Sequence, residues 1–213
     1  MRDIKLNFIN RSNDNTKDVV IYQPNIATMS YNEQPVAWKV FTNCGINDEH
    51  LFIFEWTVEV AIRNMFGEFD KFVEAPSGGV LEIVERNYNE QLLVSNRRTD
   101  NPSEFEVCNK LEYGSYGICC FRSDQLLAQR DDLYPSDTTY FRFPTGIHIG
   151  IVSDVEEGDE MEPEVAVTFE TELNLIGITA ADIVMTGGGS GEDATPIEFS
   201  LENIERKILR TVR

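Results

Sequence analysis

LFIFEWTVEVAIR, residues 51–63, carries the clearest structural signal in the sequence. Every second position of this stretch is apolar, and most of its polar residues fall between those positions. A period of two is that of a β-strand with one buried face, whereas a helical period would scatter the same apolar side chains around the axis. The stretch therefore predicts one long, central strand that buries Phe54, Trp56 and Val58.

The same two-residue period, or a short β-branched and aromatic run bounded by turn residues, recurs along the chain. It predicts strands near residues 4–9, 19–23, 37–42, 80–85, 91–95, 105–109, 117–122, 126–129, 139–143, 147–152, 165–175, 182–185 and 197–201. Helical periodicity is nearly absent. It predicts a short C-terminal helix over residues 204–212 and one helical turn over 179–182.

Strands without alternating helices predict an all-β fold, either an antiparallel two-sheet β-sandwich or a jelly roll. Parallel neighbours would need long crossover connections, which are usually helical. A closed barrel is the alternative. With 213 residues, of which 41% are hydrophobic, the chain can bury a full core, and we predict a single β-sandwich domain over residues 1–213.

Charge limits the classes of partner. Eighteen Lys and Arg against 37 Asp and Glu give a net charge of −19, which would repel nucleic acid and anionic lipid headgroups. We therefore expect no nucleic-acid partner. Solubility explains such an acidic composition, and a cationic partner is the alternative.

The cysteines and the N-terminal residues indicate the cellular compartment. No apolar run reaches the roughly 18 residues of a membrane helix, and residues 1–10 alternate like a strand rather than a signal peptide. We therefore expect a cytoplasmic protein with reduced, buried thiols and no disulfides. The cysteines are Cys44, Cys108, Cys119 and Cys120.

Residues 154–164, DVEEGDEMEPE, hold seven carboxylates, and carboxylate oxygens are the ligands that Ca²⁺ prefers. The spacing differs from that of an EF-hand loop, so a solvated acidic loop is the alternative. The candidate metal ligands are Asp154, Glu156, Glu157, Asp159 and Glu160. Ca²⁺ is the one cofactor the sequence raises.

Catalytic motifs are scarce. The run TGGGSG at 186–191 lacks the lysine of a phosphate-binding loop and is followed by two acidic residues, which favours a simple loop. His50 lies at a loop end and His148 within an apolar strand, and neither has a nucleophile in a known motif. We name no catalytic residue, and the composition favours a non-enzymatic protein.

Two further features bear on binding. Tyr113, Tyr116, Tyr134 and Tyr140, with Trp38 and Trp56, could form a patch for a small molecule or glycan. Basic residues gather at the end of the sequence and predict self-association with an acidic loop of another copy, giving a homo-oligomer. They are Arg206, Lys207, Arg210 and Arg213.

Three stretches, DVVIYQPN (18–25), AWKV leading to NCG (37–45) and ADIVMTGGG (181–189), resemble a family of uncharacterised bacterial all-β proteins. That resemblance implies no activity. The opening strand and the acidic all-β composition are also similar, at the level of fold, to aegerolysin-type and actinoporin-type sandwiches, which engage lipids. The sequence therefore favours a non-enzymatic binding or self-assembling β-sandwich, then a membrane-lipid-recognising protein, then a metal-dependent enzyme.

Overall fold

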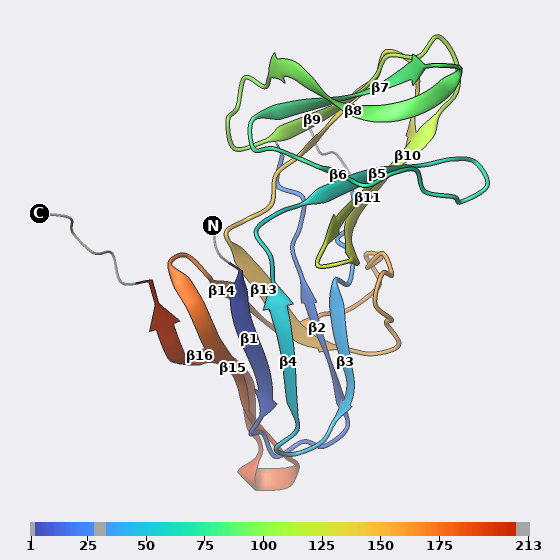
Figure 1. The fold of residues 1–213 in the computed structure, drawn as a ribbon. Coiled ribbons are helices and arrows are strands. Elements are labelled where there is room, and N and C mark those ends of the chain that lie inside the picture. The colour runs from blue at the N-terminus through green and yellow to red at the C-terminus, as the bar shows by residue number, and fades with distance from the viewer. Residues whose placement is uncertain (1–2, 28–32, 208–213) are drawn as a thin grey trace, which may run out of the picture. The chain divides into compact units, whose positions relative to one another are not determined.

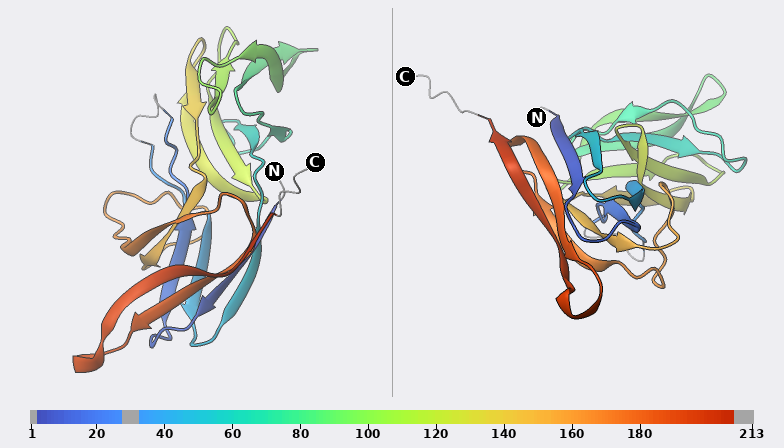
Figure 2. Two further views of the ribbon diagram at one scale, coloured as in Figure 1. Left: turned by 90° about the vertical axis from the view of Figure 1, so that its left-hand side faces the viewer. Right: turned by 90° about the horizontal axis from the view of Figure 1, so that it is seen from below.

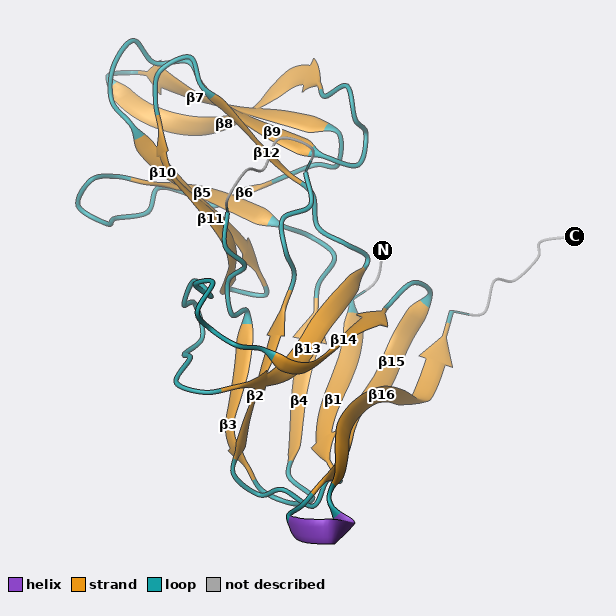
Figure 3. Cartoon of the chain, turned by 180° about the vertical axis from the view of Figure 1, so that it is seen from behind, coloured by secondary structure: helices purple, strands orange, loops and turns teal. Residues whose placement is uncertain are grey.

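The computed structural model describes residues 3–27 and 33–207, and within them the only helix is the short 3-10 turn Gly191–Asp193 (Figures 1 and 3). This confirms the all-β prediction. The chain forms two compact units, which we describe separately. The first comprises Met1–Tyr22, Ala37–Trp56 and Thr145–Arg213, and the second Gln23–Val36 and Thr57–Pro144. The prediction of a single domain stays a prediction, for which one cooperative melting transition is the test.

The first unit contains two four-stranded sheets that form a sandwich. One sheet has the order β16 (Thr195–Arg206), β15 (Ile178–Gly188), β1 (Ile4–Asn10) and β4 (Glu49–Phe54). The other has the order β14 (Thr168–Asn174), β13 (Gly146–Val152), β2 (Lys17–Tyr22) and β3 (Lys39–Cys44). Phe8 of β1 stacks on Phe41 of β3 with ring centroids 5.1 Å apart, so the inner faces of the two sheets meet.

The second unit also contains two four-stranded sheets. The first is β11 (Gln125–Leu133), β10 (Tyr116–Arg122), β5 (Glu59–Arg63) and β6 (Val73–Glu74). The second is β12 (Thr138–Phe141), β9 (Phe105–Asn109), β7 (Gly79–Arg86) and β8 (Asn89–Arg98). Ile83 of β7 and Ile118 of β10 are fully buried, so each sheet contributes an apolar face to the core.

Two strand pairs are parallel, which the sequence analysis did not expect. β1 pairs with β15 from Lys5 opposite Ala180 onward, and β7 pairs with β9. The expectation assumed that a parallel neighbour needs a crossover helix. Here β8 returns the chain between β7 and β9, and most of the sequence separates β1 from β15, so no helix is needed.

The predicted long strand over residues 51–63 is wrong, because it is two strands in two units. β4 ends at Phe54 and pairs with β1 at the edge of its sheet, whereas β5 begins at Glu59 and lies between β10 and β6. Phe54 and Val58 are buried as expected. Trp56 is only half-buried and lies edge-on to Phe54. Val60 and Ile62 of β5 continue the two-residue apolar period that runs to Phe54 in β4, although Ala61 between them is buried as well, so the sequence period continued across the break.

The two predicted helical segments are strands where the structure describes them. Residues 179–182 belong to β15, and residues 204–206 belong to β16, while residues 208–213 lie outside the described part of the chain. β15 and β16 form a long hairpin with the 3-10 turn at its tip (Figure 2). Pairing with β15 supplies the hydrogen bonds that a short amphipathic helix would otherwise make internally.

The cysteines are all buried and free, as expected from their apolar surroundings. Cys119 packs with Ala61 and Phe121 in a small apolar cluster. Burial is the largest cause that raises the pKa of Cys120, and it raises the pKa of Cys44 to about 12. These thiols therefore stay protonated in the folded protein near neutral pH.

Candidate functional site

The acidic segment of residues 154–164 is anchored to the first unit rather than being a flexible loop. Val155 and Met161 are buried and pack with apolar residues of β2 and β13. The Ala37 N–H donates to the Asp159 carbonyl at 2.9 Å, and the Gly158 N–H donates to the Ala37 carbonyl at 2.8 Å. The segment therefore covers part of this sheet, with its carboxylates facing outward.

The predicted calcium ligands do not converge in the structure. Within residues 3–27 and 33–207, no group of three or more His, Cys, Asp and Glu side chains is placed to hold a metal ion. Asp159 instead accepts a hydrogen bond from the Glu156 N–H, and Glu157 accepts one from the Val40 N–H. The calcium prediction therefore rests on composition alone, and so does the prediction of a metal-dependent enzyme. The calcium ligands it named are Asp154, Glu156, Glu157, Asp159 and Glu160.

The glycine-rich run has a structural explanation. Gly187 and Gly188 have φ angles of +80° and +75°, which favour glycine. A Cβ atom on Gly188 would lie 2.5 Å from a carboxylate oxygen of Asp14, and one on Gly187 would strike the Pro196 carbonyl. The Asn13 N–H also donates to the Gly187 carbonyl. These glycines permit close backbone approach at the end of β15.

His148 belongs to a hydrogen-bonded cluster in the first unit. Its Nδ1 lies 2.6 Å from Glu170 Oε1, and the Tyr22 hydroxyl donates to the same oxygen at 2.7 Å. The hydrogen bond from Tyr22 is the largest cause that lowers the pKa of Glu170. Burial, followed by Glu170, raises the pKa of Tyr22. A β-bulge and a φ of +54° at Phe169 precede Glu170 and set its direction.

The cluster resembles the base and orienting acid of a catalytic triad, but no serine or cysteine of the described chain is hydrogen-bonded to His148. It joins β14 to β2 and β13 instead. His50 is likewise a packing residue, because its ring stacks on Phe41 and Phe8 with centroids 4.8 and 6.1 Å apart. His50 Nε2 is buried without a hydrogen-bond partner, so within residues 3–27 and 33–207 neither histidine is hydrogen-bonded to a nucleophile.

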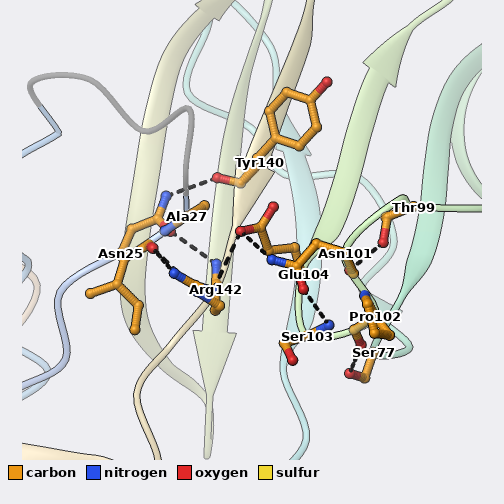
Figure 4. Close-up of polar contacts among 11 residues, drawn as sticks. Asn25, Ala27, Ser77, Thr99, Asn101, Pro102, Ser103, Glu104, Tyr140 and Arg142 are labelled. Carbon is orange, nitrogen blue, oxygen red and sulfur yellow. Dashed lines mark hydrogen bonds and ion pairs between the residues drawn. The ribbon is translucent and has the colours of Figure 1, made fainter.

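A second polar network lies in the other unit and is structural (Figure 4). Buried Glu104 accepts a hydrogen bond from Asn101 at 2.9 Å and lies 3.8 Å from an Arg142 guanidinium nitrogen. Arg142 also donates to the Ile26 carbonyl, and its N–H donates to Asn25 Oδ1. The network ties the segment containing Asn25 and the loop before β9 to β12.

The strongest candidate for a binding site is the loop between β5 and β6. It extends beyond the strands of its sheet (Figures 1 and 3). Met65 and Phe66, at its tip, are 87% and 79% exposed. Exposed apolar groups of this size, grouped together, mark interaction surfaces more often than single exposed residues do. Phe69 and Phe72 of the same loop are about half exposed.

The loop is held in one conformation by Asn64. The Asn64 side-chain oxygen accepts hydrogen bonds from the N–H groups of Phe66 and Glu68 at 2.9 and 3.0 Å. The Asn64 N–H donates to the Glu68 carbonyl, and the Gly67 N–H donates to the Asn64 carbonyl. Gly67 has a φ of +82° with open space around it. The apolar tip is therefore preorganised, which reduces the entropy lost on binding.

Two aromatic rings fix the base of the loop. Phe69 and Phe72 pack edge-on against Phe121 of β10, with centroids 5.5 and 4.9 Å apart. Phe121 itself is 9% exposed. The loop consequently stands on the sheet that contains β10, with Met65 and Phe66 left outside.

A cavity of about 280 Å³ adjoins this loop, between strands β5 and β10 of one sheet and β8 of the other. Three acidic and two aromatic residues line it together with one aliphatic and one amide residue, namely Glu68, Asp70, Glu90, Phe69, Tyr116, Ile62 and Asn64. Burial, followed by the charge of Glu90, raises the pKa of Tyr116. Within the described residues, no Lys or Arg forms a salt bridge with these three carboxylates. Glu68 accepts a hydrogen bond from the Asn64 amide at 3.0 Å, and in this described part of the chain the negative charges of the three side chains are not balanced by an ion pair.

A second cavity, of about 330 Å³, shares Glu90 with the first. Glu85, Lys110, Glu112 and Tyr113 are among its lining residues. Two of the six aromatic residues predicted to form a ligand patch, Tyr113 and Tyr116, therefore line cavities. The prediction that Trp38 belongs to such a patch is wrong, because its side chain is fully buried.

The predicted self-association residues lie at the end of β16. Arg206 donates to the Ile176 carbonyl at 3.3 Å, and the Lys207 N–H donates to the Gly177 carbonyl at 3.2 Å. Arg210 and Arg213 lie outside the described residues. The structure therefore gives no position for half of this basic cluster.

Sequence reasoning missed the β5–β6 loop because its apolar residues lack the two-residue period of a strand, and a single turn of helical spacing around Gly67 is too short to predict a helix. The signal was present in residues 64–72, NMFGEFDKF, where four large apolar side chains occur around the turn residues Asn64 and Gly67. Turns are normally polar and exposed to solvent. Large apolar residues in a turn therefore indicate an exposed apolar surface. Glu90 and Tyr116 could not be added from sequence, since only strand pairing brings them to this loop.

Comparison with known proteins adds no family. No family model, no curated protein and no solved structure matches the chain. The described residues also contain no helix of the length and apolarity that spanning a membrane requires. The resemblances drawn from sequence thus remain predictions, and the candidate site rests on geometry.

Proposed function

We propose that the protein is a non-enzymatic binding protein that holds a basic, apolar peptide segment on the β5–β6 loop and its adjoining cavity. One observation carries this proposal: two preorganised, exposed apolar side chains, Met65 and Phe66, stand beside a cavity lined with carboxylates and aromatic rings. Apolar side chains of a partner would cover the tip, and a Lys or Arg would enter the cavity. The functional class agrees with the prediction from sequence.

The cavity size favours a side chain over a whole small molecule. Pockets for drug-sized ligands typically measure about 300–1,000 Å³, and this cavity, of about 280 Å³, lies just below that range. A Lys or Arg stem can lie along the rings of Phe69 and Tyr116 while its charged head meets Glu68 or Glu90. The long-range field of a chain with net charge −19 would speed the encounter with such a partner.

A lipid surface is the less favoured partner. Glu68 and Asp70 lie within four residues of Phe66, so inserting the tip would bring two carboxylates towards the low-dielectric interface. Burying an ionised carboxylate without a partner is costly. A cationic peptide, by contrast, neutralises the same groups.

The test is fluorescence anisotropy with a labelled eight-residue peptide of alternating Lys and Leu. We expect binding that weakens at least tenfold in Phe66→Ser and in the Glu68→Gln/Glu90→Gln double variant. Leu51→Ser removes an equally exposed apolar side chain from β4, and Glu162→Gln/Glu164→Gln removes the same charge from the acidic segment. Both controls should bind as the wild type does.

Equal weakening in both double variants would contradict the proposal, because it would mean that net charge alone attracts the peptide. Peptides in which Glu replaces Lys, or Ser replaces Leu, separate the two contributions. Co-sedimentation with phosphatidylcholine vesicles tests the lipid alternative. Binding to vesicles that Phe66→Ser abolishes, without peptide binding, would replace the proposal with that alternative.

A further inference from the structure

Resting on the proposed function, we infer that the peptide held by this site is residues 207–213 of a second copy of the chain, so that copies assemble head to tail. The sequence of this segment is KILRTVR. It combines the two properties that the site selects, since three cations are interspersed with the apolar residues Ile208, Leu209 and Val212. Four of the 18 basic residues of the chain lie in its last eight positions.

The donor segment directly follows β16 in the sequence. Arg206 is the last residue of β16, and one of its guanidinium nitrogens donates to the Ile176 carbonyl. Lys207 is exposed, and its backbone N–H is held by Gly177. Shortening the chain after Lys207 thus leaves every described hydrogen bond of β16 in place.

The acceptor has matching chemistry. Three carboxylates, Glu68, Asp70 and Glu90, line the cavity, and three cations, Lys207, Arg210 and Arg213, lie in the segment. Met65 and Phe66 offer apolar surface beside these charges. The acidic segment 154–164, the acceptor predicted from sequence, offers exposed carboxylates but buries Val155 and Met161. Exposed ion pairs alone contribute little, so the cavity is the better acceptor.

The geometry of such a contact is heterologous, because the donor and the acceptor are different surfaces of the same chain. Each copy then keeps one free donor and one free acceptor, unless the assembly closes into a ring. We therefore expect oligomers whose size rises with protein concentration and falls with salt, because salt screens the charges.

The first experiment measures binding of the labelled peptide KILRTVR to a chain that ends at Lys207. We expect binding that Phe66→Ser and Glu68→Gln/Glu90→Gln each weaken at least tenfold, whereas Glu162→Gln/Glu164→Gln leaves it unchanged. If the Lys-Leu peptide binds and KILRTVR does not, the inference is wrong and the proposed function stands. If neither peptide binds, both are wrong.

The second experiment is complementation, followed by light scattering. The chain ending at Lys207 keeps the acceptor but only one of the three donor cations, and full-length Phe66→Ser keeps the donor with a weakened acceptor. Each should be monomeric alone, and an equimolar mixture should form a heterodimer at low salt that dissociates in 0.5 M NaCl, about three times the physiological ionic strength. If the equimolar mixture stays monomeric, assembly between copies is wrong. It is also wrong if the wild type is monomeric and does not bind the added peptide, because its own C-terminal segment would then occupy its site.

Discussion

The acidic segment of residues 154–164 and the β5–β6 loop of residues 64–72 differ in where their apolar side chains lie. In the first, Val155 and Met161 are buried, and the carboxylates remain as a solvated outer surface. In the second, Met65 and Phe66 are exposed beside carboxylates that line a cavity. Seven carboxylates made the first segment prominent in the sequence, yet the less acidic loop has the geometry of a binding site. Exposed apolar surface, rather than charge density, distinguishes them.

The largest effect is expected from a buried aromatic residue set against an exposed one. Trp38 is fully buried and lies edge-on to Phe52 and Phe54. Trp38→Ala should lower the free energy of unfolding by about 3–5 kcal/mol, through lost transfer energy and the cavity it leaves. Phe66→Ala should change it by less than about 0.5 kcal/mol. Urea denaturation measures both, and similar losses would contradict the assignment of Phe66 to an exposed site.

A matched pair of methionines sharpens the comparison between the two loops. Met161→Ala removes a buried anchor and should cost about 2 kcal/mol, at the low end for core methionines because one side of its cluster is a loop. Met65→Ala removes a side chain that is 87% exposed and should leave stability unchanged while weakening peptide binding. If Met161→Ala had no effect on the urea midpoint, the acidic segment would be mobile after all.

A smaller, pH-dependent effect is expected at Glu170, in the first unit. Its folded pKa is lowered, chiefly by the hydrogen bond from Tyr22 and then by His148. The stabilisation is therefore present above the ordinary carboxyl pKa and is lost as the pH falls through the lowered value. Because the side chain is 43% exposed, solvent screens part of the effect. Glu170→Gln should flatten the acid side of a stability profile below about pH 4.5, whereas the exposed Glu172→Gln should not.

The smallest effect is expected from reductant. All four cysteines are buried and free, and burial raises the pKa of Cys44 and Cys120. The melting temperature should be the same with and without dithiothreitol, and an aromatic disulfide reagent should label the native protein slowly and the denatured protein completely. A drop of several degrees on reduction would reveal a disulfide and contradict the expected cytoplasmic location.

The sequence by itself determined the all-β class and nearly every strand, because the two-residue period records which face of a strand is buried. Residues 105–109 were predicted as a strand with the bounds that β9 has. The burial of Phe54 and Val58 followed from the same period. These are local properties of alternating side chains, so one sequence suffices to find them.

Only the tertiary structure decided where strands change partner and which side chains meet. The break at residues 55–58 was invisible because the apolar positions keep a two-residue period from β4 into β5, although the two strands belong to different sheets. Glu90 and Tyr116 join the β5–β6 loop only because β8 and β10 come together at the cavity. Residues 179–182 became strand because pairing with β16 outweighs their weak helical preference. Non-local pairing of this kind leaves no periodic trace in the chain.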